Sequence, residues 1–159
     1  DLKALGTWDQ GKNMLVVMFL NLFYDYMLKV EKKAFIGSDP QLRAIDSFLL
    51  VDEADQIMKL EFPVLRRILL QGREFGIGVI LASQYLSHFK QDTENYSEPL
   101  LTWILHKVPN ISARDLSAIG LTDSANEVAE KIKQLKTHHS FYKTSIGGAC
   151  FMKNVTFFE

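Results

Sequence analysis

The chain has very little cysteine: Cys150 is the only one among its 159 residues. A single thiol can form neither an internal disulfide nor a thiolate cluster around a metal, so neither holds this fold together. Such a chain fits the reducing interior of a cell, which predicts a cytoplasmic protein. The four histidines, His88, His106, His138 and His139, have no ligand spacing on a common helical face, so we expect no metal site built from them.

The sequence also lacks a long apolar run and an excess of charge of either sign. Its most apolar stretch, Met14 to Phe23, is too short to span a bilayer and lacks the layout of a signal peptide. Eighteen basic and nineteen acidic side chains leave a net charge of -1, so no overall field draws the chain to nucleic acid. The local basic clusters at 29–33, 66–67 and 131–136 are typical of solvated helix faces. We expect no membrane partner, and contacts with DNA would have to come from a few loops.

Absent too is the phosphate-binding loop, GxxxxGK[ST]. Lys12 is followed by Asn13, and the Gly-Gly pair at 147–148 is followed by Ala149. The backbone donors and the lysine of that loop supply much of the grip on nucleotide phosphates. We therefore predict that these residues alone bind a nucleotide weakly at most and do not hydrolyse it.

What is present begins with an apolar run that ends in two carboxylates. Phe48 to Val51 predicts a strand buried on both faces of a parallel sheet, and Asp52 and Glu53 follow it. Ligands of open α/β sheets bind outside the carboxyl ends of the strands. There, Asp52 can hold Mg²⁺ through its water shell and Glu53 can activate an attacking water. The alternative is that both only begin a solvated helix, whose dipole favours acidic residues.

A second apolar run, Val79 to Ser83, is followed by Gln84. Gly72 predicts the end of the preceding helix, and the glycine-rich segment 72–78 leads into this strand. The Gln84 amide both donates and accepts, so it can bridge a terminal phosphate and an attacking water. The alternative is an amide that caps a backbone turn.

Around these strands, the apolar pattern predicts further elements of an α/β domain. A helix over 13–30, beginning near Gln10, is apolar on nearly every side, which fits a position between a sheet and another layer. Asp39 and Pro40 predict the start of a short helix that leads into the first strand. A helix over 64–71, with Val64 and Ile68 facing the sheet, joins the two strands as a parallel crossover.

The second half of the chain predicts a polar loop followed by strands and short helices. The loop over 86–99 reads as a mobile linker or as a surface for DNA or a neighbouring subunit. Beyond it we expect a buried strand over 101–108, a helix capped by Ser112 and Asp115 and ended by Gly120, a helix over 122–135, and a hairpin of 139–146 with 149–158. Length and composition fit a single domain over residues 1–159.

The run LLQGREFGIGVILASQ, Leu69 to Gln84, after LLVDEAD resembles the HerA and FtsK class of DNA-translocating P-loop ATPases. Within that class, the sequence of this chain is most similar to the ATPase-like component of DNA-phosphorothioation-dependent restriction systems. The resemblance implies the carboxyl-terminal portion of a RecA-like core, a parallel sheet flanked by helices with a carboxyl-terminal β-hairpin. The phosphate loop of the family lies upstream of this region. ATP and Mg²⁺ are the implied cofactors. DNA and other subunits of the restriction complex are the implied partners, and the implied assembly is a hexameric ring.

The resemblance also implies roles for single residues. Asp52 is placed beside Mg²⁺, Glu53 beside the attacking water and Gln84 beside the γ-phosphate. Arg73 is a candidate arginine finger that reaches a neighbouring subunit's nucleotide, where it stabilises charge in phosphoryl transfer. The alternatives for Arg73 are an ion pair with Glu74 and an exposed loop charge.

Two other functions fit parts of the sequence. Asp52 to Asp55 spells the motif of DEAD-box RNA helicases, although those enzymes carry Ser-Ala-Thr where this chain has Ala82, Ser83 and Gln84. A degenerate ATPase-like module kept for ring assembly is the other alternative, since fold alone does not establish activity.

Overall fold

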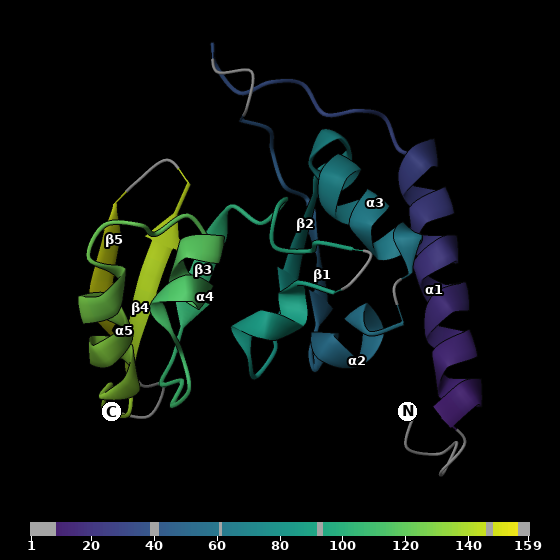
Figure 1. The fold of residues 1–159 in the computed structure, drawn as a ribbon. Helices are drawn as coiled ribbons and strands as arrows, with labels where there is room; N and C mark the ends of the chain where they lie inside the picture. The colour runs from purple at the N-terminus through teal and green to yellow at the C-terminus, as the bar shows by residue number, and fades with distance from the viewer. Residues whose placement is uncertain (1–8, 39–41, 61, 92–93, 146–147, 156–159) are drawn as a thin grey trace. The chain divides into compact units, whose positions relative to one another are not determined.

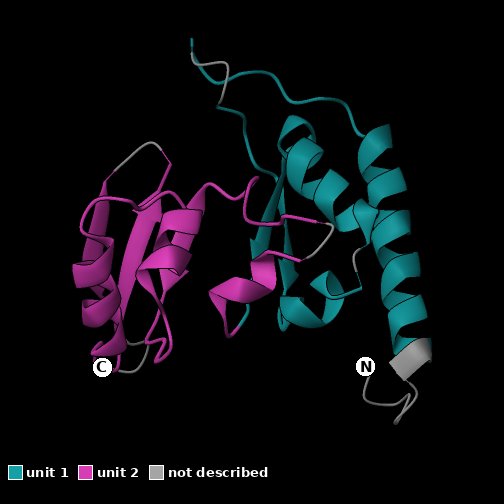
Figure 2. Cartoon of the chain, viewed as in Figure 1, with its two compact units in different colours: residues 1–83 teal, residues 84–159 magenta. Residues whose placement is uncertain are grey.

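The computed structural model of the chain describes residues 9–38, 42–60, 62–91, 94–145 and 148–155. It shows an α/β protein with one small parallel sheet and one antiparallel sheet. The chain divides into two compact units, residues 1–83 and 84–159 (Figure 2). The single-domain prediction from chain length stays a prediction.

The first unit follows the predicted order of helix, strand, helix and strand (Figure 1). Its elements are α1 (Asp9–Lys29), β1 (Ser47–Val51), α2 (Ala54–Met58), α3 (Pro63–Gln71), the 3-10 helix η2 (Gly72–Phe75) and β2 (Ile77–Leu81). Strands β1 and β2 pair in parallel, from Ser47 opposite Ile77 to Val51 opposite Leu81. Both predicted strands and their parallel pairing are therefore confirmed.

The prediction that β1 is buried on both faces is wrong. Val51 is 7% exposed, whereas Phe48 and Leu50 are 64% and 66% exposed. Ile80, opposite Leu50 in β2, is exposed as well. Side chains alternate between the faces of a strand, so Phe48, Leu50 and Ile80 share one face. The apolar run has the composition of a doubly buried strand, but this face is largely exposed among the described residues.

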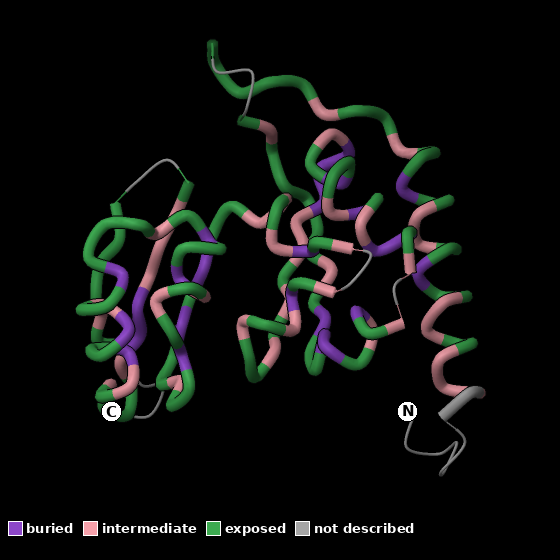
Figure 3. The backbone as a smooth tube through the Cα atoms, in the orientation of Figure 1, coloured by how far each residue is buried: buried purple, intermediate pink, exposed green. Residues whose placement is uncertain are grey.

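Helix α1 is likewise covered on one side only, in contrast to the two layers predicted for it. Leu20 and Met27 are buried, and Met27 packs with Phe75 and Ile77. Three other apolar side chains spaced four residues apart are exposed: Met14, Met18 and Leu22. The burial colours along α1 show this division (Figure 3). The packed side reaches α3 and η2 and anchors the helix to the unit.

Residues 42–46, the described part of the segment before β1, do not form the short helix predicted there. Arg43 forms an antiparallel bridge with Phe35, and its guanidinium lies 4.1 Å from the Phe35 ring centroid and donates to the Lys33 carbonyl. The N–H of Ile36 also donates to the carbonyl of Leu42 at 2.9 Å. These contacts within the chain hold the backbone extended on both sides of the bridge. Asp39 and Pro40 lie outside the described residues.

Helix α3 confirms its prediction, with Pro63 at the first helical position and Val64, Leu65 and Ile68 buried. Gly72 caps its carboxyl end in a right-handed conformation, and η2 continues the turn. The left-handed residue that redirects the chain into β2 is Gly76, at φ 73.

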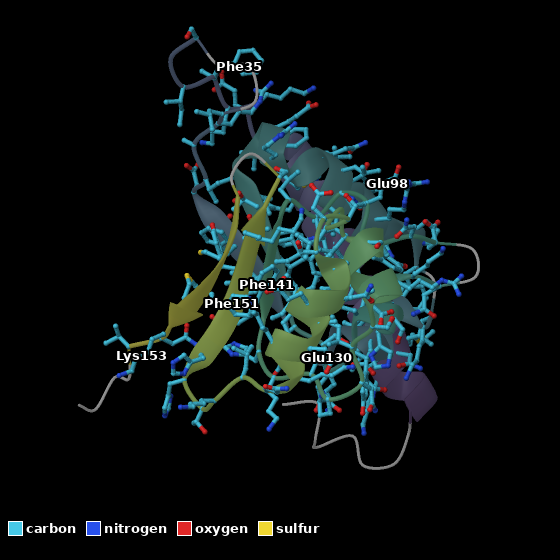
Figure 4. The ribbon with its side chains drawn as sticks, turned by 60° about the vertical axis from the view of Figure 1, so that its left-hand side comes forward. Phe35, Glu98, Glu130, Phe141, Phe151 and Lys153 are labelled. Carbon is cyan, nitrogen blue, oxygen red and sulfur yellow. The ribbon has the colours of Figure 1, made fainter. Side chains whose placement is uncertain are left out.

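The second unit contains a three-stranded antiparallel sheet in the order β3-β4-β5. Its elements are η3 (Leu86–Phe89), β3 (Thr102–Leu105), α4 (Ala113–Ala118), α5 (Ala125–Lys133), β4 (His139–Thr144) and β5 (Ala149–Lys153). The hairpin of β4 and β5 is confirmed, while the turn residues 146–147 and the phenylalanines at 157–158 lie outside the described residues. Phe141 is buried in this hairpin, with the Phe151 ring centroid 5.0 Å away (Figure 4).

Two predictions for this unit need correction. Strand β3 is shorter than predicted and buried on one face, since Trp103 and Leu105 are buried and Ile104 is exposed. The loop over 86–99 is not a free linker, because Phe89 and Tyr96 are buried and the Tyr96 N–H donates to the Phe89 carbonyl at 2.8 Å. The prediction followed the polar composition of the loop and did not account for the burial of these two aromatic side chains.

The caps of α4 match their prediction. Ser112 and Asp115 form a reciprocal capping box, and Gly120, at φ 79, follows the end of the helix. In α5, Ala125 and Ile132 lie on the buried side as predicted.

Candidate functional site

The candidate site lies at the carboxyl edge of the parallel sheet in the first unit. The Ala82 N–H donates to the Val51 carbonyl at 2.9 Å, and the Ala54 N–H donates to the Ala82 carbonyl at 2.8 Å. These bonds extend the pairing of β1 and β2 past the last residue of each strand. They hold the turn that contains Asp52 and Glu53 against the end of β2.

Glu53 has an unusual backbone, with φ 50 and ψ 42 in the left-handed region. For a residue with a Cβ atom this conformation costs about 1 kcal/mol. The Asp52 carboxylate supports it, because Oδ1 accepts the Glu53 N–H at 2.9 Å. Both side chains are exposed, so the turn presents two adjacent carboxylates to solvent. Such local strain concentrates at functional sites.

The alternative, that the two carboxylates only begin a helix, stays a prediction beside the catalytic one. Helix α2 does begin at Ala54, but Ala54, Asp55 and Met58 are buried. Glu53 occupies the N-cap position without a side-chain hydrogen bond to the helix. Neither burial nor capping explains why a glutamate adopts a left-handed conformation here.

Gln84 and Arg73, the other two predicted site residues, are not part of this turn. Gln84 is exposed, follows Ser83 directly and is the first residue of the second unit, so its geometry relative to Asp52 is not described. Arg73 is exposed in η2, before β2 begins. In a parallel pair the amino ends lie at the edge opposite the carboxyl ends, so Arg73 does not join Asp52 and Glu53 within this chain.

The predicted alternative of an ion pair between Arg73 and Glu74 is not formed. Glu74 pairs with Lys32, whose Nζ lies 2.6 Å from Oε2. The hydrogen bond and charge of Lys32 lower the pKa of Glu74, and Arg43 and Arg73 add weaker attraction. Arg73 is thus an exposed charge, and its role across a subunit boundary stays a prediction.

An apolar cleft of about 520 Å³ adjoins the turn. It is lined by α1 and β1, including Leu15, Phe19, Leu50 and Asp52. Asp52 is the only charged residue among the described lining residues, and none of them is basic. The cleft can take an apolar group beside a carboxylate, but it has no cation to hold a phosphate.

One stretch of the sequence nearly matches the phosphate-loop motif. Residues 6–13 read GTWDQGKN, which has both glycines and the lysine at the loop's spacing and departs from it at Asn13. Gly11, Lys12 and Asn13 lie within the first turns of α1, which begins at Asp9, and residues 6–8 lie outside the described part. A search that relaxed the last position would have found this stretch.

The described ranges also bear on metal-binding clusters and on membrane-spanning helices. No group of three or more His, Cys, Asp or Glu side chains in those ranges is placed to hold a metal ion. None of the helices described there combines the length and the apolar character needed to cross a bilayer.

No protein family and no curated protein matches the chain. Among solved structures, it is similar to the genome-packaging NTPase B204 from Sulfolobus turreted icosahedral virus 2, determined in complex with AMPPCP. The two share 22% identity with a TM-score of 0.48 over 69% of this chain. The matched region spans 52% of the NTPase.

Proposed function

We propose that this chain supplies the magnesium-coordinating and water-activating residues of an ATPase that moves or remodels DNA. The observation that carries the proposal is the strained Glu53 beside Asp52, held at the carboxyl edge of a parallel sheet. Ligands of α/β sheets bind at this edge, and adjacent carboxylates there suit a hydrated Mg²⁺ and an attacking water.

In the proposed mechanism each residue acts on one part of the reaction. Asp52 would hold Mg²⁺ through its water shell, and Glu53 would orient the attacking water and accept its proton. Gln84 contacts the γ-phosphate and links it to the loops that follow. Arg73 reaches the nucleotide of the next subunit in a ring of six, which agrees with its place at the opposite edge of the sheet from Glu53. When bound, Mg²⁺ would supply positive charge beside the phosphoryl group of ATP, the substrate.

The motif resemblance narrows the proposal to one kind of system. The sequences of segments 69–89 and 98–110 resemble that of DptH, the ATPase-like component of DNA-phosphorothioation-dependent restriction systems. The partners would then be DNA and the other subunits of that bacterial defence complex. The sheet would belong to a RecA-like core of the HerA and FtsK class. A phosphate loop outside these 159 residues would complete the site.

The test is DNA-stimulated ATP hydrolysis by the whole protein that contains this chain, with its partners supplied. The Glu53→Gln variant keeps the size of the side chain but removes the base, so we expect nucleotide binding to persist and turnover to fall by about 10²-fold or more. Glu130→Gln, an equal charge change on α5, is the control and should leave turnover unchanged. An unchanged rate in Glu53→Gln would sink the assignment.

The chain alone provides a second check. It should not hydrolyse ATP, because no strict phosphate loop is present. Hydrolysis that is lost in Lys12→Ala would place the loop at residues 6–13 and overturn this part of the proposal.

A second candidate function is a non-catalytic assembly module. The observation that favours it is the exposed apolar face of Phe48, Leu50 and Ile80, which suits burial against further protein. No hydrolysis by the whole protein or by Glu53→Gln, with partners and DNA present, would select this function. Nothing in the described residues favours the RNA helicase alternative.

A further inference from the structure

The second unit has a hollow of about 490 Å³ whose polar lining is basic. It lies where the end of β3, the turn after α5 and the start of β4 meet. Five of its residues carry ammonium or imidazole groups: His106, Lys107, Lys136, His138 and His139. No carboxylate is among the residues described as lining it. The proposed ATPase mechanism uses none of these residues.

The lysines of the hollow differ from their neighbours on α5. Lys131 and Lys133 pair with glutamates of their own helix at 2.5 and 2.6 Å. Lys107 and Lys136 form no ion pair within the described ranges, and both are exposed. The basic cluster predicted as a solvated helix face therefore has two parts, one neutralised and one with its charge available to a ligand.

The backbone fixes the side of the hollow that carries the histidines. His138 is left-handed at φ 60, and its carbonyl accepts the Asn154 N–H at 2.6 Å. The His139 ring nitrogen Nδ1 donates to the Thr137 carbonyl at 2.9 Å. Lys153 is opposite His139 in the pairing of β4 with β5, so the two side chains project from the same face of the sheet, and Lys153 lies near the end of the hairpin strand (Figure 4).

This arrangement suits phosphate groups better than other ligands. Lysine ammonium groups and imidazole N–H groups are donors to phosphate oxygens, and the absence of lining carboxylates removes competition for them. A cation would meet only like charge from Lys107 and Lys136. Because the donors come from three separate elements around an open hollow, they match successive phosphates of a polymer better than one enclosed anion.

We propose that this hollow, with Lys107 and Lys136 as its main cations, binds the phosphodiester backbone of DNA, and the choice of DNA as the polymer rests on the proposed function. The contact is to phosphates, so it positions DNA without reading its sequence. It would act independently of ATP hydrolysis.

The test is binding of the full chain to a fluorescein-labelled DNA duplex, measured by anisotropy at several salt concentrations. Removal of one phosphate contact lowers the slope of log affinity against log salt by about one. We expect Lys107→Ala and Lys136→Ala each to show that change and to weaken affinity by roughly threefold to tenfold. Lys131→Ala and Lys133→Ala remove the same charge from neutralised pairs and should change affinity by less than about twofold. Thermal unfolding of each variant confirms that it folds.

Equal losses in all four variants would overturn the proposal, because binding would then follow net charge alone. Absence of DNA binding by the wild-type chain would overturn it too. Imidazole NMR signals of His106, His138 and His139 should shift on addition of DNA. Shifts of the same size with inorganic phosphate or ATP but none with DNA would assign the site to a small anion and overturn the choice of DNA. Since no step requires ATP turnover, these results are separable from those of Glu53→Gln.

Discussion

At the scale of single residues, backbone conformation decides which side chains are tolerated in the first unit. Gly76 turns the chain from η2 into β2 with a left-handed φ of 73. An added Cβ atom would lie 2.9 Å from Cε of Lys33 and 3.3 Å from the carbonyl oxygen of Ala44. The lysine tail can move, but the Ala44 carbonyl belongs to the backbone. Gly76 is therefore constrained by both conformation and space.

We predict that Gly76→Ala lowers the free energy of unfolding by about 1–3 kcal/mol, from the cost of a left-handed alanine and the close approach to Ala44. Urea denaturation followed by circular dichroism measures this loss. Gly148→Ala is the control, since its added Cβ would have nothing within 4 Å and its φ is not left-handed, so it should cost less than about 0.5 kcal/mol. Equal losses in the two variants would contradict the steric argument.

At the scale of elements, a serine stands at the N-cap of both α4 and α5, but only one of the two serines caps its helix with its side chain. The Ser112 side chain accepts the Asp115 N–H, and Asp115 accepts the Ser112 N–H in return. Ser124 stands at the N-cap of α5 with φ 57 and makes no side-chain cap. The two serines therefore separate the effect of capping from that of the residue type.

Ser112→Ala should reduce stability by about 1 kcal/mol, because one helical N–H loses its acceptor. Ser124→Ala should change it by less than about 0.5 kcal/mol, since no cap is lost. Thermal melts of both variants with the wild type provide the comparison. A larger loss at Ser124 than at Ser112 would show that the hydrogen bonds assigned to the capping box contribute little.

The elements also show what can be predicted from sequence. Local signals found α3, the capping box of Ser112 and the hairpin, because the apolar spacing of Val64 and Ile68, the Ser-Asp spacing and the Gly-Gly pair act within a few residues. Burial depends on distant neighbours. The run Phe48 to Val51 reads as doubly buried, but its exposure on one face depends on what packs there.

In the candidate site, too, local sequence predicted some features and tertiary packing decided others. The position of Asp52 and Glu53 after a parallel strand follows from the apolar run and from the direction of the chain. The left-handed backbone of Glu53 does not, since glutamate has no preference for it. It results from the bonds that tie Ala54 and Ala82 across the strand ends. The basic hollow was missed because its residues, which follow β3, follow α5 and begin β4, are brought together by tertiary packing.

At the scale of the whole molecule, each compact unit has its own buried side chains. Ile68 is buried in the first unit and Phe141 in the second. Sets of contacts of this kind can open separately within one chain. The number of cooperative units is therefore a measurable property of this protein.

We predict that Ile68→Ala destabilises the first unit by about 2–5 kcal/mol, from lost burial and the cavity that it leaves. Hydrogen exchange should show that loss at the amides of β1 and β2, with a smaller loss at β4. Leu70→Ala on the same helix is the control, because Leu70 is exposed. An equal loss at β4 would show one cooperative unit, as the single-domain prediction requires.

The left-handed backbone of Glu53 sets stability against activity at one position. Glycine adopts this conformation without the steric cost that glutamate bears, so Glu53→Gly should relieve about 1 kcal/mol of local strain while it removes the carboxylate. A laboratory selection that rewarded heat resistance alone would thus drift towards glycine at this position and silence the proposed enzyme. Keeping the glutamate would require that selection also reward turnover.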